Sequence, residues 1–364
     1  MQAQLQPEER FDGIMARVEE RKIPFWAHLD LTYRCNQQCL HCYCQDLAGD
    51  FSSNQEELTL GEVCRLLDQL ADMGSLHLTL SGGEVFLRRD FFDIAAHAKK
   101  RHFALKIFTN GSLIDEETAR RLAAIPPVQI EMSIYGVTAP VHDSITQRAG
   151  SFHKLVEAVA LLKKYHLRVE LKSVVMKQNF HHAGDLEAFS RTLGADDFRL
   201  STDISPKNDR SRSPQQHQIS EGQLCSLLSR SDTSAVVQHE YWSKPLERPL
   251  CQTGTVGCYI CPYGDVYPCL LLFVPMGNIR EKSLREIWYA PSALRDELNT
   301  LRTYADLHSC SRCQYVQFCN NCIGLAQLET GDARSCYSSL KTAARAAYEA
   351  SCASRKEEWY AEKR

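Results

Sequence analysis

The first part of the chain repeats one pattern six times: a short run rich in β-branched and aromatic residues, then a segment with helical periodicity. The runs predict β-strands at residues 25–33, 76–83, 104–111, 128–136, 168–176 and 197–204. The intervening segment LTLGEVCRLLDQLADMG carries Thr59 and Glu62 at the spacing of a capping box, which predicts a helix start. Because regular strand–helix alternation implies parallel strands and right-handed crossovers, we expect an α/β protein. Its predicted architecture is a partial (β/α)6 barrel of the TIM type, with its chemistry at the C-terminal ends of the strands.

The pattern changes after the sixth strand. Residues 206–218 are polar and rich in turn formers, which predicts a loop or linker, and a helix is expected near residues 220–230. Further on, Cys, Gly and Pro become dense and helical periodicity fades, which predicts a second domain whose small core is held together by metal. The expected segments are an N-terminal helical segment (1–24), the barrel (25–235), a cysteine-rich domain (236–340) and a C-terminal helix (341–364).

Composition narrows the expected environment of the protein. Lys and Arg total 42 against 45 Asp and Glu, a net charge of −3 that by itself neither favours nor excludes a nucleic-acid partner, and we expect none. No apolar run approaches the roughly 20 residues of a membrane helix, and the polar N-terminus lacks the apolar centre of a signal peptide. We therefore expect no membrane association and a cytoplasmic location. There, 16 cysteines favour metal binding over disulfides.

The densest cysteine segment is CNQQCLHCYC at residues 35–44, directly after the first predicted strand. Cys35, Cys39 and Cys42 follow the pattern C-x3-C-x2-C. A structural zinc site usually takes four ligands as two tight pairs. Three cysteines in one compact loop at the mouth of a barrel favour instead an iron–sulfur cluster with one iron left open.

This triplet, together with SGGE (Ser81 to Glu84) after the second strand, resembles the radical S-adenosylmethionine (SAM) superfamily. The resemblance implies that Cys35, Cys39 and Cys42 hold a four-iron four-sulfur cluster, whose fourth iron is chelated by the methionine part of SAM. An electron from the cluster then splits a carbon–sulfur bond and yields a 5′-deoxyadenosyl radical. The cofactor carries the difficult chemistry, while the protein positions it and excludes water.

The resemblance also implies a set of SAM contacts. They are Gly82 and Gly83 for close backbone approach to the methionine part, Glu84 for its ammonium group, His41 for the adenine, Asn110 and Ser133 for the adenosine portion, and Lys172 for the carboxylate. Asn110 and Ser133 also fit local hydrogen bonds at strand ends, and Lys172 fits a solvated lysine. Cys44, the fourth thiol of the loop, is given no ligand role.

A second cysteine set resembles the SPASM extension of radical SAM enzymes. Its marks are the G-x4-C element of Gly264 and Cys269, the run CSRCQYVQFCNNC, and a trailing cysteine. The resemblance implies two auxiliary four-iron four-sulfur clusters, and three clusters in all. Their expected ligands are Cys251, Cys258, Cys269 and Cys322 for the first, and Cys310, Cys313, Cys319 and Cys336 for the second. Cys261 is the alternative to Cys258, and a zinc ribbon is the alternative reading of the C-x2-C-x5-C-x2-C run.

The expected substrate follows from the resemblance. The first cysteine loop, the strand end SIYG and the segment HDSIT (142–146) look most like ribosomal-peptide maturases. We therefore expect a precursor peptide that undergoes oxidative modification, such as a crosslink or an excision. We also expect an electron donor such as flavodoxin or ferredoxin. Because residues 1–24 are too few for a leader-binding domain, leader recognition would need a separate partner protein or the SPASM surface itself.

Other functions stay open from the sequence. Small-molecule alternatives are radical oxidation or decarboxylation of a heme or quinone-cofactor precursor, and a further peptide alternative is formylglycine formation of the sulfatase-maturase type. A non-catalytic protein stapled by zinc is the alternative from another class. No general base stands out, since Asp203 on the sixth strand is indistinguishable from an ordinary polar position.

Overall fold

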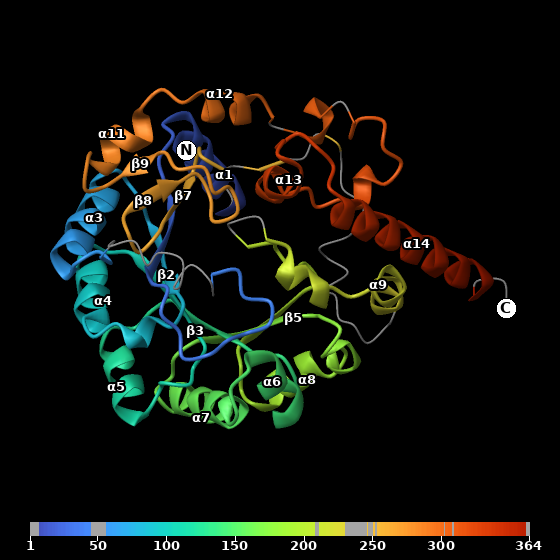
Figure 1. Cartoon of the computed structure of the whole chain (residues 1–364), viewed down its shortest axis with the longest axis horizontal. Coiled ribbons are helices and arrows are strands. Elements are labelled where there is room, and N and C mark those ends of the chain that lie inside the picture. The colour runs from blue at the N-terminus through green and yellow to red at the C-terminus, as the bar shows by residue number, and fades with distance from the viewer. Residues whose placement is uncertain are drawn as a thin grey trace, which may run out of the picture.

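The computed structural model describes residues 7–44, 56–207, 211–229, 246, 250–251, 253–301, 303–307 and 309–361. Its first part is a curved sheet of parallel strands with helices on the outer side (Figure 1). The six predicted strands are confirmed as β1 (Trp26–Thr32), β2 (His77–Gly82), β3 (Ala104–Thr109), β4 (Gln129–Ser133), β5 (Val169–Val174) and β6 (Asp197–Ser201). Neighbours in sequence are neighbours in the sheet, and every pair from β1 to β6 is parallel. The predicted α/β class is therefore confirmed.

Helices connect the strands as expected. They are α3 (Leu60–Asp72), α4 (Phe91–Lys100), α5 (Glu116–Ala124), α6 (Ala139–Thr146), α7 (Ser151–Lys164) and α8 (Leu186–Thr192), with short 3-10 turns at Val85–Leu87 and Phe180–His182. The capping box at the start of α3 is confirmed, since the Glu62 amide donates to the Thr59 hydroxyl (3.3 Å) and the Thr59 amide donates to the Glu62 carboxylate (2.7 Å). Helix α6 was not expected as a separate element, because its eight residues carry little helical periodicity.

The main hydrophobic core lies between the sheet and these outer helices. Leu29 of β1, Leu80 of β2 and Ile107 of β3 are fully buried in it, together with Leu66 of α3 and Leu155 of α7. Alternate strand residues face the opposite, concave side, because side chains of a strand alternate between its two faces. The concave side carries polar residues, so one face of the sheet is left for chemistry.

The sheet continues beyond β1 into the cysteine-rich part of the chain. Strand β7 (Gly257–Ile260) is parallel to β1, and it is followed by the antiparallel strands β8 (Asp265–Tyr267) and β9 (Gly277–Asn278). Helix α11 (Leu284–Tyr289) packs beside α3, and its fully buried Trp288 donates from the indole to the Lys22 carbonyl (2.6 Å). The first part of the cysteine-rich region thus shares the core of the barrel, which the sequence did not predict because these strands are very short.

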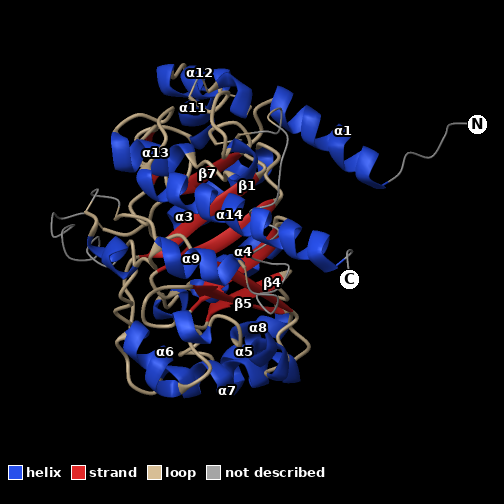
Figure 2. Cartoon of the chain, turned by 90° about the vertical axis from the view of Figure 1, so that its right-hand side faces the viewer, coloured by secondary structure: helices blue, strands red, loops and turns tan. Residues whose placement is uncertain are grey.

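A second hydrophobic core holds the rest of the cysteine-rich region. It is built from α12 (Ala293–Thr300), α13 (Ile323–Thr330) and α14 (Ser338–Ala361), with 3-10 turns at Tyr304–Asp306 and Val316–Phe318. The helix expected near residue 220 is α9 (Glu221–Leu228), which packs against α14 through an Arg345–Glu221 ion pair (Figure 2).

Three sequence expectations concern the remaining segments. Helix α1 (Pro7–Glu20) lies in the expected N-terminal helical segment. The expected linker contains a short 3-10 turn at Ser213–His217, and its residues 208–210 lie outside the described part of the chain, as does the expected domain boundary at residue 235. In the part of the chain that the structure describes, no helix is both long and apolar enough to cross a membrane.

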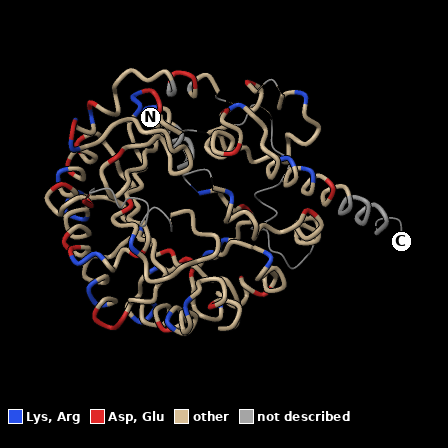
Figure 3. The backbone as a smooth tube through the Cα atoms, viewed as in Figure 1, with Lys and Arg blue, Asp and Glu red and all other residues tan. Residues whose placement is uncertain are grey.

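Charged residues of both signs are interspersed along the outer helices (Figure 3).

Candidate cofactor and substrate site

A cavity of about 480 Å³ lies at the C-terminal ends of the parallel strands. It brings together most of the residues predicted to hold the first cluster and SAM. The wall includes Cys35, Cys39, His41, Cys42, Gly82, Gly83, Asn110, Ser133 and Lys172. These residues come from the loop after β1 and from the ends of β2, β3, β4 and β5, so the predicted position of the site at the strand ends is matched by the cavity.

Two glycines clamp the first cysteine loop to the end of β2. The Gly83 amide donates to the Thr32 carbonyl (2.8 Å), and the next amide donates to the Arg34 carbonyl (2.9 Å). A Cβ atom at Gly82, where φ is +126°, would lie 2.2 Å from the Thr32 carbonyl oxygen. A Cβ atom at Gly83 would lie 2.3 Å from the Arg34 carbonyl oxygen. Glycine is therefore required here by chain packing alone, before any cofactor is considered.

Glu84 lies behind the cavity wall. Its fully buried carboxylate accepts hydrogen bonds from the Thr109 hydroxyl (2.8 Å), the Asn110 amide (2.8 Å) and the Phe86 amide (3.2 Å). Burial raises the pKa of Glu84, and these hydrogen bonds oppose the rise. The carboxylate ties the end of β2 to the end of β3, and its expected contact with the SAM ammonium group stays a prediction.

The segment HDSIT anchors the cysteine loop from the other side. The Gln38 and Leu40 amides donate to the carbonyls of Thr146 and Ile145 (both 3.0 Å), which belong to α6. Asp143 in the same helix accepts from the Phe152 amide (2.9 Å) at the start of α7. Backbone hydrogen bonds from the β2 end and from α6 therefore help to hold the loop in shape.

The three thiols of the loop interact with one another. Burial raises the pKa of Cys39, and the neighbouring thiols of Cys42 and Cys35 raise it further. A bound metal reverses this effect because it favours the thiolate. In the described part of the chain, no three ligand side chains converge closely enough to share one metal ion. A cluster does not need such convergence, since each cysteine binds a different iron.

His41 fits a ligand that brings its own hydrogen-bonding group. Its Nδ1 atom is buried and has no partner among the described residues, and its ring packs edge-on against Tyr135 (4.9 Å between centroids). Burial lowers the pKa of His41 to about 4, so the ring is neutral. A neutral ring with one unmet nitrogen in the cavity wall is compatible with an adenine, which offers both a flat face and polar edges.

Asn110 lies beside the cysteine loop. Its side-chain amide donates to the Asn36 side-chain oxygen (2.8 Å) and lies 3.8 Å from the Cys35 sulfur. Ser133 ends β4 and borders the cavity. Their expected contacts with the adenosine portion of SAM stay predictions.

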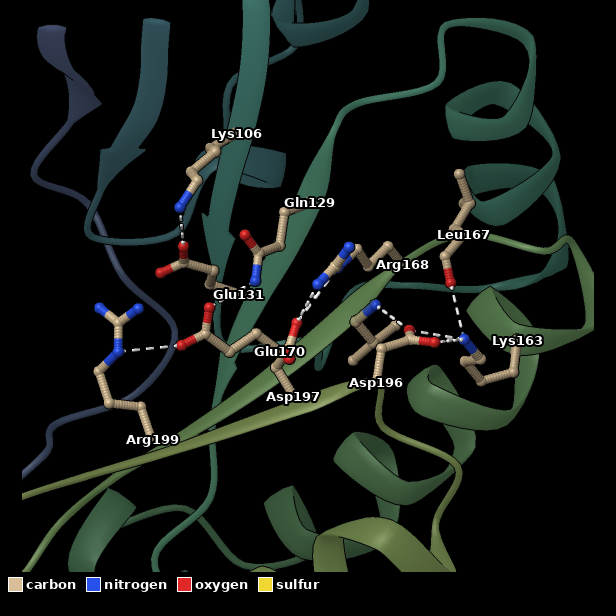
Figure 4. A network of polar contacts seen from close by, with 11 residues as sticks. Lys106, Gln129, Glu131, Lys163, Leu167, Arg168, Glu170, Asp196, Asp197 and Arg199 are labelled. Carbon is tan, nitrogen blue, oxygen red and sulfur yellow. Dashed lines mark hydrogen bonds and ion pairs between the residues drawn. The ribbon is translucent and has the colours of Figure 1, made fainter. Parts of the chain in front are cut away.

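Charged residues form the floor of the cavity. Lys172 pairs with Glu131, which also accepts from Lys106 (2.9 Å), and the Lys172 ammonium lies 4.2 Å from the centre of the Phe108 ring. Burial, with Arg199 and Lys106 nearby, lowers the pKa of Lys172 to about 7, while the ion pair with Glu131 favours the charged amine. Figure 4 shows Lys106 beside Glu131, and near them the pairs of Arg199 with Glu170, Arg168 with Asp197 and Lys163 of α7 with Asp196. The expected contact of Lys172 with the SAM carboxylate stays a prediction.

A histidine–aspartate pair on β1 was missed by the sequence analysis. His28 borders the cavity, and its Nε2 atom lies 3.1 Å from an oxygen of the fully buried Asp30. The other Asp30 oxygen accepts from the Tyr259 hydroxyl (2.8 Å), which in turn lies 2.6 Å from the Tyr33 hydroxyl. The available signal was the H-x-D spacing, because residues two apart on a strand share a face.

The expected ligands of the first auxiliary cluster are only partly brought together. Cys269 and Cys322 both pack against the second core, and the thiols of Cys269 and Cys251 contribute, after burial, to raising the pKa of Cys322. Cys258 lies instead in β7, buried in the main core, and Cys261 lies in a separate cluster with Tyr33 and Tyr267.

The expected ligands of the second auxiliary cluster lie in one region. Cys310, Cys313 and Cys319 occupy successive turns in the second core, and the Cys313 thiol helps to raise the pKa of Cys336 after burial.

Asp203, which the sequence analysis considered as a base, borders a different cavity of about 270 Å³. That cavity lies between the segment after β6 and the helices α13 and α14. Desolvation and the nearby Glu329 carboxylate raise the pKa of Asp203. The structure therefore separates Asp203 from the cysteine loop.

Comparisons with known proteins agree with this geometry. Residues 29–189 match the sequence profile of the Radical SAM superfamily, and residues 251–322 match that of the SPASM iron–sulfur cluster-binding domain. The AdoMet-dependent heme synthase of Methanosarcina barkeri is 28% identical over 331 residues, which cover 83% of this chain and 92% of the relative. The mycofactocin maturase MftC of Mycobacterium tuberculosis is 26% identical over 326 residues, which cover 83% of this chain and 78% of the relative. Among solved structures, Streptococcus suis SuiB bound to precursor peptide SuiA has a similar fold, with a TM-score of 0.60, 17% identity, and coverage of 93% of this chain and 82% of that chain.

Proposed function

The chain is a radical SAM enzyme with a C-terminal SPASM domain, and we propose that it oxidatively modifies a ribosomally made precursor peptide, forming a crosslink or excising a segment. The observation that carries the proposal is the single cavity that gathers three cysteine thiols, the glycine clamp and the neutral His41 above a polar floor. SAM and iron–sulfur clusters are the cofactors of this family. A relative that is itself a maturase supports the substrate class.

The cavity has the size of a cofactor site. Its volume of about 480 Å³ lies within the roughly 300–1,000 Å³ of a site for one small ligand.

The cysteine loop and its surroundings have the following proposed roles. Cys35, Cys39 and Cys42 would hold the SAM-binding cluster, which together with SAM would supply a 5′-deoxyadenosyl radical for hydrogen abstraction from the substrate. His41 lies against the adenine, while Asn110 and Ser133 contact the adenosine portion. Lys172 binds the carboxylate of SAM. Glu84 binds the backbone amide of Asn110 after β3, and its negative charge stabilises the ammonium group of SAM.

The His28–Asp30 pair is proposed as the proton acceptor. In a two-electron oxidation of a peptide side chain, loss of the hydrogen atom would be followed by loss of a proton to this pair and of an electron to the auxiliary clusters. His28 borders the cavity, and Asp30 fixes its ring through Nε2, which leaves Nδ1 as the basic atom. Asp30 is itself held by Tyr259, so the pair keeps its orientation when the substrate enters.

The remaining assignments also belong to the proposal. Residues 25–235 are the radical SAM barrel and residues 236–340 are the SPASM domain, with two auxiliary clusters that bring the total to three. An electron donor such as flavodoxin or ferredoxin reduces the enzyme. Recognition of the peptide leader by a separate partner protein or by the SPASM surface also belongs to the proposal.

Co-expression with a candidate precursor peptide tests the proposal. We expect the peptide to lose mass, for example two hydrogens, in a reaction that requires Cys35 and is located by fragmentation mass spectrometry. The Cys35→Ala variant must leave the peptide unchanged. Cys64→Ala is the matched control, because Cys64 lies on α3, away from the cavity wall.

One specific observation favours a second candidate. The match to the heme synthase covers 92% of the length of that relative. Radical oxidation of a heme precursor therefore stays the alternative. Assays with dithionite and SAM separate the two candidates. If a porphyrin precursor reacts and the peptide does not, the peptide assignment is wrong.

A further inference from the structure

Cys44, the fourth thiol of the first cysteine loop, lies against one of the predicted cluster ligands. Its sulfur is 3.5 Å from the Cys42 sulfur, which allows a hydrogen bond between the two thiols and is too long for a disulfide. In the described part of the chain, no other residue hydrogen-bonds to the Cys44 thiol. Both cysteines border the main cavity. The proposed cluster and SAM contacts leave Cys44 without a role, so its contact with Cys42 needs an explanation.

The surroundings of Cys44 keep its side chain in place. Cys44 is 4% exposed and belongs to a small hydrophobic cluster that also contains Tyr33 and Tyr259. The polar ends of these two rings are paired, since the Tyr259 hydroxyl donates to Asp30 (2.8 Å) and lies 2.6 Å from the Tyr33 hydroxyl. The pocket therefore holds a buried thiol whose hydrogen-bonding partner is the Cys42 sulfur.

Iron binding at Cys42 would fix the direction of this hydrogen bond. In the free thiols either sulfur can be the donor. A cysteine that ligates iron is a thiolate and has no proton to donate. The Cys44 thiol would then be the donor and the Cys42 sulfur the acceptor. Because this acceptor carries negative charge, the hydrogen bond is stronger than one between two neutral thiols.

Cys35, another predicted ligand, has the same arrangement with nitrogen donors. Its sulfur accepts a hydrogen bond from the Gln37 backbone amide (3.4 Å), and the side-chain nitrogen of Asn110 lies 3.8 Å away. Hydrogen bonds to the sulfurs are among the factors that set the reduction potential of an iron–sulfur cluster. At Cys42, the thiol of Cys44 occupies the place that these amides have at Cys35.

We propose that Cys44 donates a hydrogen bond to the Cys42 sulfur and thereby raises the reduction potential of the SAM-binding cluster. Reduction adds one negative charge, which the ligand sulfurs share, so a donor at a sulfur stabilises the reduced form more than the oxidised form. Cys44 acts on the reaction through Cys42 and is not itself a ligand. This inference rests on the proposed ligand set of Cys35, Cys39 and Cys42.

The reduction potential is measured by electron paramagnetic resonance during an anaerobic redox titration without peptide. The signal that changes when SAM is added belongs to the first cluster, which separates it from the signals of auxiliary clusters. We expect a more negative midpoint potential in Cys44→Ala and Cys44→Val, because neither side chain can donate. Cys44→Ser is expected to keep the potential close to that of the unchanged protein, because its hydroxyl is still a donor. Cys64→Ala on α3 is the control for removal of a cysteine elsewhere.

The choice of reductant gives a second measurement. With dithionite, Cys44→Val is expected to form deoxyadenosine more slowly than the unchanged protein. With the stronger reductant titanium(III) citrate, the rate of this variant is expected to rise toward that of the unchanged protein. A merely structural defect would not be restored by a stronger reductant, so a rate that stays low with both reductants argues against the proposal.

Three outcomes overturn the proposal. The first is an unchanged potential in both Cys44→Ala and Cys44→Val. The second is an equally lowered potential in Cys44→Ser, which would exclude the hydrogen bond as the cause. The third is loss of the cluster from both apolar variants, shown by iron and sulfide analysis of protein that circular dichroism finds folded. That loss would assign Cys44 a role in holding the cluster.

Failure of the underlying proposals has different signatures. If Cys42 is not a ligand, Cys42→Ala keeps the signal that responds to SAM. If the substrate is not a peptide, every measurement described for Cys44 is unaffected, because none of them contains a substrate.

Discussion

The first cysteine loop and the SPASM cysteines hold their thiols in opposite ways. At the barrel mouth, one short loop carries all three thiols, and backbone hydrogen bonds from the β2 turn and α6 already fix its shape. In the SPASM region, Cys251, Cys269 and Cys322 come from distant segments joined by turns and a small core. From this comparison we expect the cysteine loop of the barrel to keep its shape without metal, and we expect the SPASM region to depend on metal for its fold.

The largest expected effect separates chemistry from folding in the barrel. We expect Cys39→Ala to abolish deoxyadenosine formation from SAM while the melting temperature of the barrel stays unchanged, because the loop is held by backbone contacts. Cys64→Ala serves as the control and keeps full activity. A large drop in melting temperature for Cys39→Ala would show that the loop depends on its metal as well.

Removal of the metal probes the other half of the comparison. After iron chelation under anaerobic conditions, limited proteolysis is expected to cut between residues 290 and 340 and to leave the barrel intact. The reason is that the second core is small, whereas α11 and β7 share the main core. Equal resistance of both regions in the apo-protein would contradict the comparison.

His28→Gln tests whether His28 of the barrel accepts the proton that the substrate releases during oxidation. We expect peptide modification to fall by about 100-fold, the lower limit of general-base effects, with deoxyadenosine formation retained. Asp203→Asn is the matched control from the second cavity and is expected to keep product formation. The measurement is the ratio of product to deoxyadenosine, followed against pH. Equal losses in both variants would argue against His28 as the acceptor.

Gly83→Ala measures how firmly the barrel holds the loop. The added methyl group meets the Arg34 carbonyl oxygen at 2.3 Å, so the loop must move, at a cost of about 1–3 kcal/mol in the free energy of unfolding. We also expect less iron in the first cluster. Gly222→Ala on α9 is the control, since a Cβ atom there meets nothing within 4 Å. A fully loaded first cluster in Gly83→Ala would show that the loop tolerates displacement.

The smallest expected effect comes from an ion pair that links the two regions. Arg280, in the segment after β9, donates to Glu62 on α3 (2.7 Å), and this bond is the main cause that lowers the pKa of Glu62 from 4.5 to about 2. Because the pair is partly exposed, Arg280→Ala is expected to cost about 0.2–1 kcal/mol in chemical denaturation.

The sign of the pH dependence follows from the lowered pKa of Glu62. The stabilisation by the pair is fully present above pH 4.5, and it is lost as the pH falls through about 2, where the folded carboxylate becomes protonated. The difference between Arg280→Ala and the unchanged protein should therefore shrink in that window. A difference that grows on acidification would assign the effect to another group.

The agreement between sequence and structure is closest where the signal is local. The six strands, the capping box at Thr59 and the helix near residue 220 were predicted from periodicity and spacing, and all are confirmed. The cavity also brings together the three cysteines predicted for the first cluster and most of the residues predicted to contact SAM. These features depend on residues close together in the chain or on the rule that parallel strands end at one edge.

The sequence by itself determined the α/β class, the loop with three closely spaced cysteines and the family to which the chain belongs. The reason is that short-range patterns specify strands, helices and ligand spacing. Only the tertiary structure decided that β7 joins the barrel sheet and carries Cys258 into the core. Only the tertiary structure separated Asp203 from the cysteine loop and placed the His28–Asp30 pair in the cavity. The physical reason is that burial and the neighbours of a side chain depend on segments hundreds of residues apart, whose pairing no local pattern records.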